Sequence, residues 1–421
     1  MKTQQLRINS KNSRVSKEMV QAVETEPIQN SVIEETSKKF QIDQKVKQRL
    51  FLSLFFFLSG FNFASWASRI PTIKAALGLN EAELGSVLLT MPISSMIGLP
   101  LSGWLVSRYD TRVPLTLAFL LNAVSLSLIG LAHSTFNLVI ALFLFSLSTR
   151  IFNIAMNTQA ITLQKLFDRK INGSFHGLWS TGGIVGVGVT TFIISQGISI
   201  TPHLVTVAVI TILITLFASR FLLRNDRAAT KTKQAFAKPD AYILYLGLLV
   251  FFAAICEGGM FDWSGIYFQK VVKEDLFTIG YLTFMTFMAF SRFVSDRIIE
   301  KMGMAPTYLM SALCIFTGIS LAISFPSFWP ALIGFSFVGF GTAAVIPMTY
   351  TLAGASEKYS PGVAISLIAS FGIVGMLLGP PLIGYIAHAS NLKMSFIAFA
   401  VSGMMLIPIS RLFFKLTKLN N

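Results

Sequence analysis

Residues 136–163 read FNLVIALFLFSLSTRIFNIAMNTQAITL, a mostly apolar run with one charged side chain, Arg150. A helix rises about 1.5 Å per residue and the hydrocarbon core of a bilayer is about 30 Å thick, so a helical run of this length crosses a membrane. Backbone polar groups find no water in lipid, and a single run can satisfy them internally only as a helix. The stretch therefore predicts a transmembrane helix.

Similar runs recur along the rest of the chain. Of its 421 residues, 53% are hydrophobic and 13% are charged, whereas about a quarter of the residues in a soluble domain are charged. We therefore predict an all-α membrane protein. Its twelve expected transmembrane helices cover Arg49–Ile70, Leu84–Val106, Val113–Ala132, Phe136–Leu163, Gly173–Gln196, Pro202–Leu223, Ala241–Phe268, Leu276–Asp296, Pro306–Phe325, Phe328–Ala355, Pro361–Ala387 and Asn391–Phe414.

The basic residues are distributed by side of the membrane. The formal net charge is +15, and when successive breaks are assigned to alternate sides, most Lys and Arg residues fall on one side. The largest group lies between Arg220 and Lys238, whereas the other side has little beyond Lys74, Lys270, Lys273 and Lys393. The positive-inside bias then places both termini in the cytoplasm. Because topology accounts for the basicity, we expect no nucleic-acid partner.

Polar segments divide the chain into four parts. Residues 1–48 contain no apolar run and predict a disordered cytoplasmic tail. Residues 225–240 form a basic break and predict a cytoplasmic linker. The linker separates two expected bundles of six helices each, residues 49–224 and a second bundle with a short tail, residues 241–421.

Short repeats support this division into halves. The tetrapeptide GIVG occurs at residues 183–186 and again at residues 372–375, in the fifth and eleventh expected helices. Ser65-Trp66 and Asp262-Trp263 likewise lie near the ends of the first and seventh. Such repeats predict two pseudo-symmetric bundles with a binding site between them near the middle of the membrane.

Two loops resemble those of the major facilitator superfamily. That family carries a pattern close to G-x-x-x-D-R-x-G-R after its second span, and residues 103–112 here read GWLVSRYDTR, with Ser107 in place of the usual Asp. The counterpart after the eighth span, residues 291–297, reads SRFVSDR and keeps the Asp-Arg pair. The resemblance implies the major facilitator fold and a cytoplasmic gate in which Arg292 pairs with Asp296. The expected gate residues are Arg108, Arg112, Arg292, Asp296 and Arg297.

A narrower likeness is to a bacterial branch of uncharacterised inner-membrane permeases related to the fucose permease group. It is carried by residues 65–71, 155–160, 174–176, 257–264 and 377–384. This resemblance implies a multi-pass protein of the bacterial inner membrane, a monomer, and a small-molecule substrate. That branch commonly has an acidic residue where this chain has Asn153 and a small residue where it has Arg150, so its proton-coupling scheme does not carry over directly.

Arg150 is the most informative residue for function. A charge in the middle of a transmembrane helix costs at least about 2.5–3.5 kcal/mol, so it is expected to face a cavity or a partner. Asn153 and Asn157 follow it on the same helical face. We predict that this stripe lines a substrate pathway, where Arg150 binds an anionic group or forms a switchable pair with a carboxylate of the other half. A fixed structural ion pair is the alternative.

Two carboxylates and a histidine are candidates for coupling transport to protons. Glu257 is the deeper carboxylate and is expected either to carry a proton or to pair with a cation, whereas Asp262 is a candidate for an outer gate or a solvated helix cap. The intervening Gly258-Gly259 could unwind the helix locally. His176 is a candidate proton relay, with a hydrogen-bonded packing role as the alternative.

Further pathway candidates lie near the outer ends of the first and seventh helices. Asn62, Trp66 and Arg69 share one helical face. Trp66 and Trp263 could stack on a sugar or an aromatic ligand, or belong to the aromatic belt at the membrane interface.

Catalytic and metal motifs are absent from the sequence. It contains no Walker loop, H-E-x-x-H or Cys-x-x-Cys, and its four His and two Cys have no metal-ligand spacing. We expect no enzyme, metal or cofactor. The prediction is a secondary active transporter of a small polar solute, sugar-like or an organic anion, working by alternating access and coupled to protons. Efflux of a drug or metabolite by the same fold, and a receptor that does not transport, are the alternatives.

Overall fold

The computed structural model describes residues 44–167, 171–224, 226, 239–359 and 361–419. The chain forms two compact units, Met1–Phe51 and Leu52–Asn421. Of the first unit only residues 44–51 are described, and they are helical. The predicted disordered tail therefore lies mostly outside the described residues, as does most of the predicted linker.

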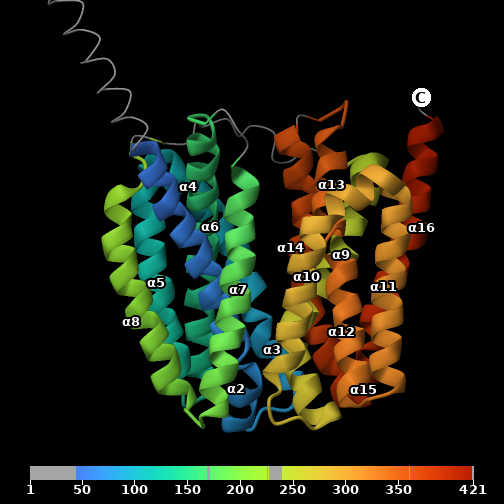
Figure 1. The fold of residues 1–421 in the computed structure, drawn as a ribbon, viewed down its shortest axis with the longest axis horizontal. Coiled ribbons are helices and arrows are strands. Elements are labelled where there is room, and N and C mark those ends of the chain that lie inside the picture. Colours follow the sequence, from blue (N-terminus) through green and yellow to red (C-terminus); the bar gives the residue numbers. More distant parts are fainter. Residues whose placement is uncertain (1–43, 168–170, 225, 227–238, 360, 420–421) are drawn as a thin grey trace, which may run out of the picture. The chain divides into compact units, whose positions relative to one another are not determined.

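Every regular element in the described part of the chain is a helix (Figure 1). Helical residues run from 44 to 67. The first half continues with α2 Ile70–Ala76, α3 Glu81–Leu88, α4 Thr90–Arg108, α5 Arg112–Gly130, α6 Thr135–Gln164, α7 Asn172–Ser195, α8 Ile200–Ala218 and the 3₁₀ turn Ser219–Phe221. The second half consists of α9 Ala241–Tyr267, the π turn Phe268–Val272, α10 Thr278–Met302, α11 Met304–Ser324, α12 Phe328–Thr342, α13 Val345–Gly354, α14 Pro361–Ala389, α15 Leu392–Ser395 and α16 Ile397–Leu419.

Each of the twelve predicted spans coincides with helical structure in the described part of the chain. Eleven of them are long and apolar enough to cross a membrane. The remaining one, α10, ends in a charged stretch and continues past the predicted boundary at Asp296 to Met302, where Gly303 adopts a left-handed φ of 85° and stops it. The prediction from hydropathy made α10 too short, because a helix can continue past the hydrocarbon core of the membrane into the polar region.

Glycines of the GIVG repeat pack equivalent helices together in the two halves. A Cβ atom on Gly186 of α7 would lie 2.8 Å from the carbonyl oxygen of Phe61 and 3.0 Å from the Ala64 Cβ. A Cβ atom on Gly375 of α14 would lie 2.4 Å from the Phe251 oxygen of α9 and 3.1 Å from the Ala254 Cβ. Each half thus uses one glycine to bring its fifth span against its first, a close approach typical of helices in lipid.

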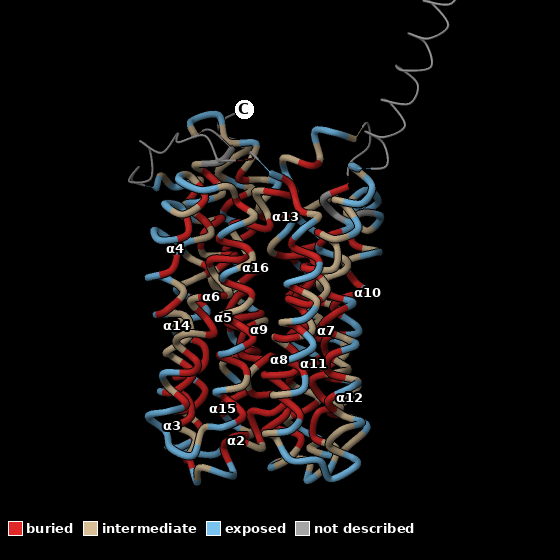
Figure 2. The backbone as a smooth tube through the Cα atoms, turned by 90° about the vertical axis from the view of Figure 1, so that its left-hand side faces the viewer, coloured by how far each residue is buried: buried red, intermediate tan, exposed pale blue. Residues whose placement is uncertain are grey.

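The outward-facing surface of the helices is largely apolar, and several polar side chains are buried among the apolar core residues. Large side chains such as Phe136, Phe293 and Trp329 are 72%, 74% and 70% exposed. Asn62, Asn122 and Gln159 are buried, and buried positions gather on the inner sides of the helices (Figure 2). Exposed side chains of this kind match a lipid environment, whereas a soluble protein rarely exposes so much contiguous apolar surface.

Candidate functional site

A cavity of about 290 Å³ lies between the two halves. Its lining residues lie near the middle of long helices, such as Arg150 on α6 and Glu257 on α9. The volume is near the lower limit for a ligand site and fits a small solute. The polar side chains on its wall are Ser59, Ser95, Asn122, Ser146, Thr149, Arg150 and Asn153 of the first half, and Glu257 and Asp262 of the second.

Arg150 reaches the cavity from α6, as the sequence predicted. Its Nε donates a hydrogen bond to Ser95 Oγ of α4 at 2.7 Å. A Cβ atom on Gly98 of α4 would lie 3.1 Å from the Arg150 Cβ, so the glycine lets α4 pack closely against the stem of the arginine. Neither the expected partner carboxylate nor a fixed ion pair is found for Arg150 among the described residues. Its partner is a hydroxyl.

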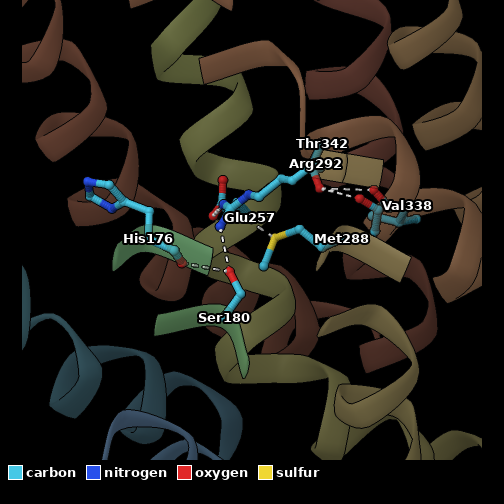
Figure 3. A network of polar contacts seen from close by, with 8 residues as sticks. His176, Ser180, Glu257, Met288, Arg292, Val338 and Thr342 are labelled. Carbon is cyan, nitrogen blue, oxygen red and sulfur yellow. Dashed lines mark hydrogen bonds and ion pairs between the residues drawn. The ribbon is translucent and has the colours of Figure 1, made fainter. Parts of the chain in front are cut away.

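Glu257 is paired with an arginine of its own half. Arg292 of α10 contacts the Glu257 carboxylate at 3.3 Å, and its other terminal nitrogen donates to Ser180 Oγ of α7 at 3.2 Å (Figure 3). Arg292 therefore joins a carboxylate of the second half to a hydroxyl of the first. This geometry turns Arg292 toward α9 and Glu257, and the expected pair between Arg292 and Asp296 stays a prediction. The Asp296 side chain lies outside the described residues.

Asp262 also lines the cavity, one and a half turns along α9 from Glu257. No hydrogen bond or ion pair of its carboxylate is found within the described part of the chain. The expected unwinding at Gly258-Gly259 is wrong, since α9 is continuous from Ala241 to Tyr267. The glycines instead make room for neighbours: a Cβ atom on Gly259 would lie 2.2 Å from the Phe399 ring.

Four predicted pathway residues lie in the interior of a bundle, outside the cavity lining. Asn62 is buried, contacts Asn122 at 3.3 Å and accepts a hydrogen bond from Thr211 at 2.9 Å. Arg69 is buried and donates to His203 Nδ1 and to the Ile198 carbonyl oxygen. Trp66 and Trp263 are 1% and 0% exposed. Both expectations for the tryptophans, a ligand platform and an interfacial belt, are corrected, because each ring packs inside its half.

The stripe on α6 is only partly in the cavity. Asn153 lines the cavity, whereas the Asn157 side chain lies outside its lining and donates to the Asn153 carbonyl oxygen at 2.8 Å. His176 packs its ring edge-on against Phe56 at 5.6 Å. Figure 3 shows its imidazole pointing away from Glu257, while its carbonyl oxygen accepts a hydrogen bond from Ser180.

The remaining gate candidates lie at helix ends. Arg108, the last residue of α4, is exposed and lies over the Trp104 ring at 5.9 Å. Arg112 begins α5, and Arg297 is exposed on α10. The structure does not bring these three arginines to the cavity.

Contacts between the halves close the end of the molecule at which α2 ends and α3 begins, called the distal end below. Glu81 at the start of α3 contacts Lys74 of its own half at 3.4 Å and Lys270 of the second half at 2.6 Å. Two further hydrogen bonds cross between the halves, Ser86 to Tyr385 at 3.0 Å and Thr191 to Thr278 at 2.7 Å. Helical periodicity did not predict these contacts. The sequence offered one signal, the acidic residue Glu81 on the same predicted side of the membrane as Lys74 and Lys270.

Comparison with known proteins fits this architecture. The sequence profile of the Major Facilitator Superfamily matches residues 51–356. The chain belongs to this superfamily. An uncharacterized MFS-type transporter of Yersinia pestis is 34% identical over 353 residues, which cover 83% of this chain and 92% of that protein. The predicted superfamily is thereby confirmed, and the narrower likeness to the fucose permease group stays a prediction.

Solved structures show the same fold at low sequence identity. A bacterial homolog of the human lysosomal transporter Spinster has a TM-score of 0.69 and 16% identity, with 88% of this chain and 98% of that chain covered. The nucleoside transporter NupG has a TM-score of 0.69 and 14% identity, with 88% and 99% covered. This member of the superfamily is a multi-pass membrane protein of a transporter family and not an enzyme.

Proposed function

We propose that this protein is a secondary active transporter that moves a small polar solute by alternating access. The observation that carries the proposal is a cavity near the middle of the helices whose charged lining comes from both halves, Arg150 from one and Glu257 and Asp262 from the other. A solute bound there contacts both halves, so a rocking motion of one against the other exposes it first to one side and then to the other.

The contacts at the distal end give this motion a physical basis. Lys270 and Glu81 are held together across the halves when that end is closed. Opening the end separates them, whereas Lys74 and Glu81 both belong to the first half and stay together. The closed distal end therefore represents one of the two states that the cycle requires.

Glu257 is the proposed site of proton coupling. A proton on Glu257 neutralises the carboxylate that pairs with Arg292. Because Arg292 also donates to Ser180 of the other half, that proton acts directly on a contact between the halves. His176 is the second candidate: its imidazole would carry the proton, and its backbone carbonyl oxygen accepts a hydrogen bond from Ser180, the hydroxyl that Arg292 also contacts.

Two solute classes fit the polar groups on the cavity wall, a sugar-like molecule bound by hydrogen bonds and an organic anion bound by Arg150. Either class can be imported or extruded by the same fold. The protein is proposed to work as a monomer in the bacterial inner membrane with both termini in the cytoplasm. A receptor on the same fold would bind solute without moving it, and transport in vesicles separates the two functions.

The test uses purified protein in liposomes that contain a pH-sensitive dye. A panel of sugars, organic acids and amino acids is added outside, with and without an imposed pH gradient. We expect at least one solute to drive dye-detected proton movement. With that solute, Glu257→Gln should keep solute exchange but lose accumulation driven by the gradient, because exchange does not require the proton to leave.

The matched control is Glu300→Gln, which replaces an exposed carboxylate at the far end of α10. It should behave like wild type in both assays. If no solute of the panel crosses the vesicle membrane under either condition, the transport proposal is rejected. If Glu257→Gln still accumulates solute against the gradient, proton coupling through Glu257 is rejected.

A further inference from the structure

Two of the charged side chains on the cavity wall have no counter-ion among the described residues, and the two have opposite charges. Three charged side chains line the cavity, Arg150, Glu257 and Asp262. Glu257 has Arg292 as its counter-ion. One positive and one negative group remain without a counter-ion among the described residues, and they belong to opposite halves of the protein.

Arg150 presents the edge of its guanidinium that suits a carboxylate. Its Nε is bound to Ser95 and its stem packs against Gly98, so α4 fixes the side chain from behind. The two terminal nitrogens have no hydrogen-bond partner in the described part of the chain. Paired terminal nitrogens bind the two oxygens of a carboxylate side by side. Asn153, one turn further on α6, adds a side-chain amide to the same wall.

Asp262 presents an acceptor on the facing half. Its neighbours Phe261 and Trp263 are 5% and 0% exposed, and Phe261 packs edge-on against Phe63 of the first half at 5.6 Å. An ionised carboxylate with apolar neighbours is stabilised by a cation, and aromatic rings nearby tolerate an ammonium group well. Phe63, Phe261 and Trp179 all line the cavity.

We infer that the solute is a small zwitterion, whose carboxylate binds Arg150 and whose ammonium group binds Asp262. The inference rests on the proposed function and narrows its organic-anion class. A neutral sugar would leave both groups uncompensated, and a simple anion would leave Asp262 uncompensated. A zwitterion compensates both and joins the two halves through a single ligand. The cavity volume of about 290 Å³ restricts it to molecules of amino-acid size.

The test is a binding measurement on detergent-purified protein by calorimetry or thermal shift. The probes are glycine, 4-aminobutyrate and 6-aminohexanoate, which vary the distance between the charges. Butyrate, n-butylamine and glucose serve as the anion, the cation and the neutral sugar. We expect one zwitterion of the series to bind at least about ten-fold tighter than all three comparison compounds, as expected for a second charged hydrogen bond.

Variants assign each charge to its residue. Arg150→Gln should weaken the binding of that zwitterion about ten- to a hundred-fold. Arg150→Lys should have an affinity between those of Arg150→Gln and wild type, because Lys keeps the positive charge but lacks the paired terminal nitrogens of the guanidinium. Asp262→Asn should weaken the zwitterion but leave butyrate unchanged. Arg220→Gln and Asp275→Asn, which replace exposed residues elsewhere, are the matched controls and should bind like wild type.

Each other outcome overturns the inference. If butyrate binds as tightly as the zwitterions, the site is a simple anion site. If glucose is the tightest-binding probe, the site is a sugar site. If no zwitterion binds, the proposed solute class is rejected. Binding is measured without translocation. A zwitterion that binds as expected but does not cross the liposome membrane would therefore reject transport while this inference stands.

Discussion

Replacing Lys270 by Gln is expected to shift the protein away from the state with a closed distal end, without a loss of folding stability. Lys270 contacts Glu81 at 2.6 Å and is the only member of the lysine pair that belongs to the second half. Its side chain is 45% exposed, so water screens the pair and the contribution is about 0.5–1 kcal/mol. At about 1.4 kcal/mol per factor of ten, the population ratio changes about two- to five-fold.

Lys74→Gln is the matched control, since Lys74 contacts the same carboxylate from within the first half. Lys74 is 6% exposed at its side chain and also donates to the Leu79 carbonyl oxygen. Its loss should lower folding stability by about 1–3 kcal/mol, because a buried charged contact is broken. It should not shift the population toward an open distal end, because its contact with Glu81 lies within the first half and its charge repels Lys270 of the second half.

The assay is a distance measurement between spin labels on either side of the distal end. Gln196→Cys after α7 and Asp275→Cys before α10 are exposed attachment sites that flank a hydrogen-bonded contact between the halves. They are introduced into protein without Cys256 and Cys314. The long-distance component should grow about two- to five-fold in Lys270→Gln and should not grow in Lys74→Gln. Identical distributions for the parent and Lys270→Gln, or an equal shift in both variants, would refute the reasoning.

Three further predictions concern folding. Gly182→Ala places a Cβ atom 2.0 Å from a backbone oxygen of the first helix and should lower the free energy of unfolding, measured by thermal denaturation, by more than about 3 kcal/mol. The control Gly188→Ala has open space around the new Cβ atom and should be neutral or stabilising. Equal effects of the two substitutions would contradict the packing argument. Arg292→Gln should lower the free energy of unfolding by about 2–3 kcal/mol, because it leaves Glu257 without its counter-ion. Adding Glu257→Gln should recover part of this loss. Strictly additive losses in the double variant would exclude an energetic coupling between the two residues. Burial raises the pKa of Asp226, so the stability linked to its protonated form is present at low pH and is lost as pH rises through that raised pKa. Asp226→Asn should flatten the decline in melting temperature as pH rises above about 4, the ordinary pKa of an Asp, and parallel pH profiles of the two proteins would refute this prediction.

The interior arrangement of polar residues limits what helical periodicity alone can predict. The spacing of Asn62, Trp66 and Arg69 predicted one shared helical face, but the first helix ends at residue 67 and Arg69 lies just beyond it, as the N-cap of α2. Spacing alone does not show which neighbouring helix that face contacts. In the structure Asn62 and Arg69 face α5 and α8 and not the cavity, and their partners are Asn122, Thr211 and His203. The prediction that Arg150 faces a cavity was correct, because exposing a charge to lipid costs too much free energy for the side chain to point outward.

The sequence by itself determined the order of the apolar helical segments and the presence of a charged group inside the membrane, because the length and polarity of a helical segment are local properties. Tertiary structure alone decided which charges meet. Lys270 and Glu81 are 189 residues apart in sequence, and Glu257 pairs with Arg292 rather than with Arg150. These pairings depend on how each helix is rotated and tilted against its neighbours, and packing across the whole bundle sets that orientation.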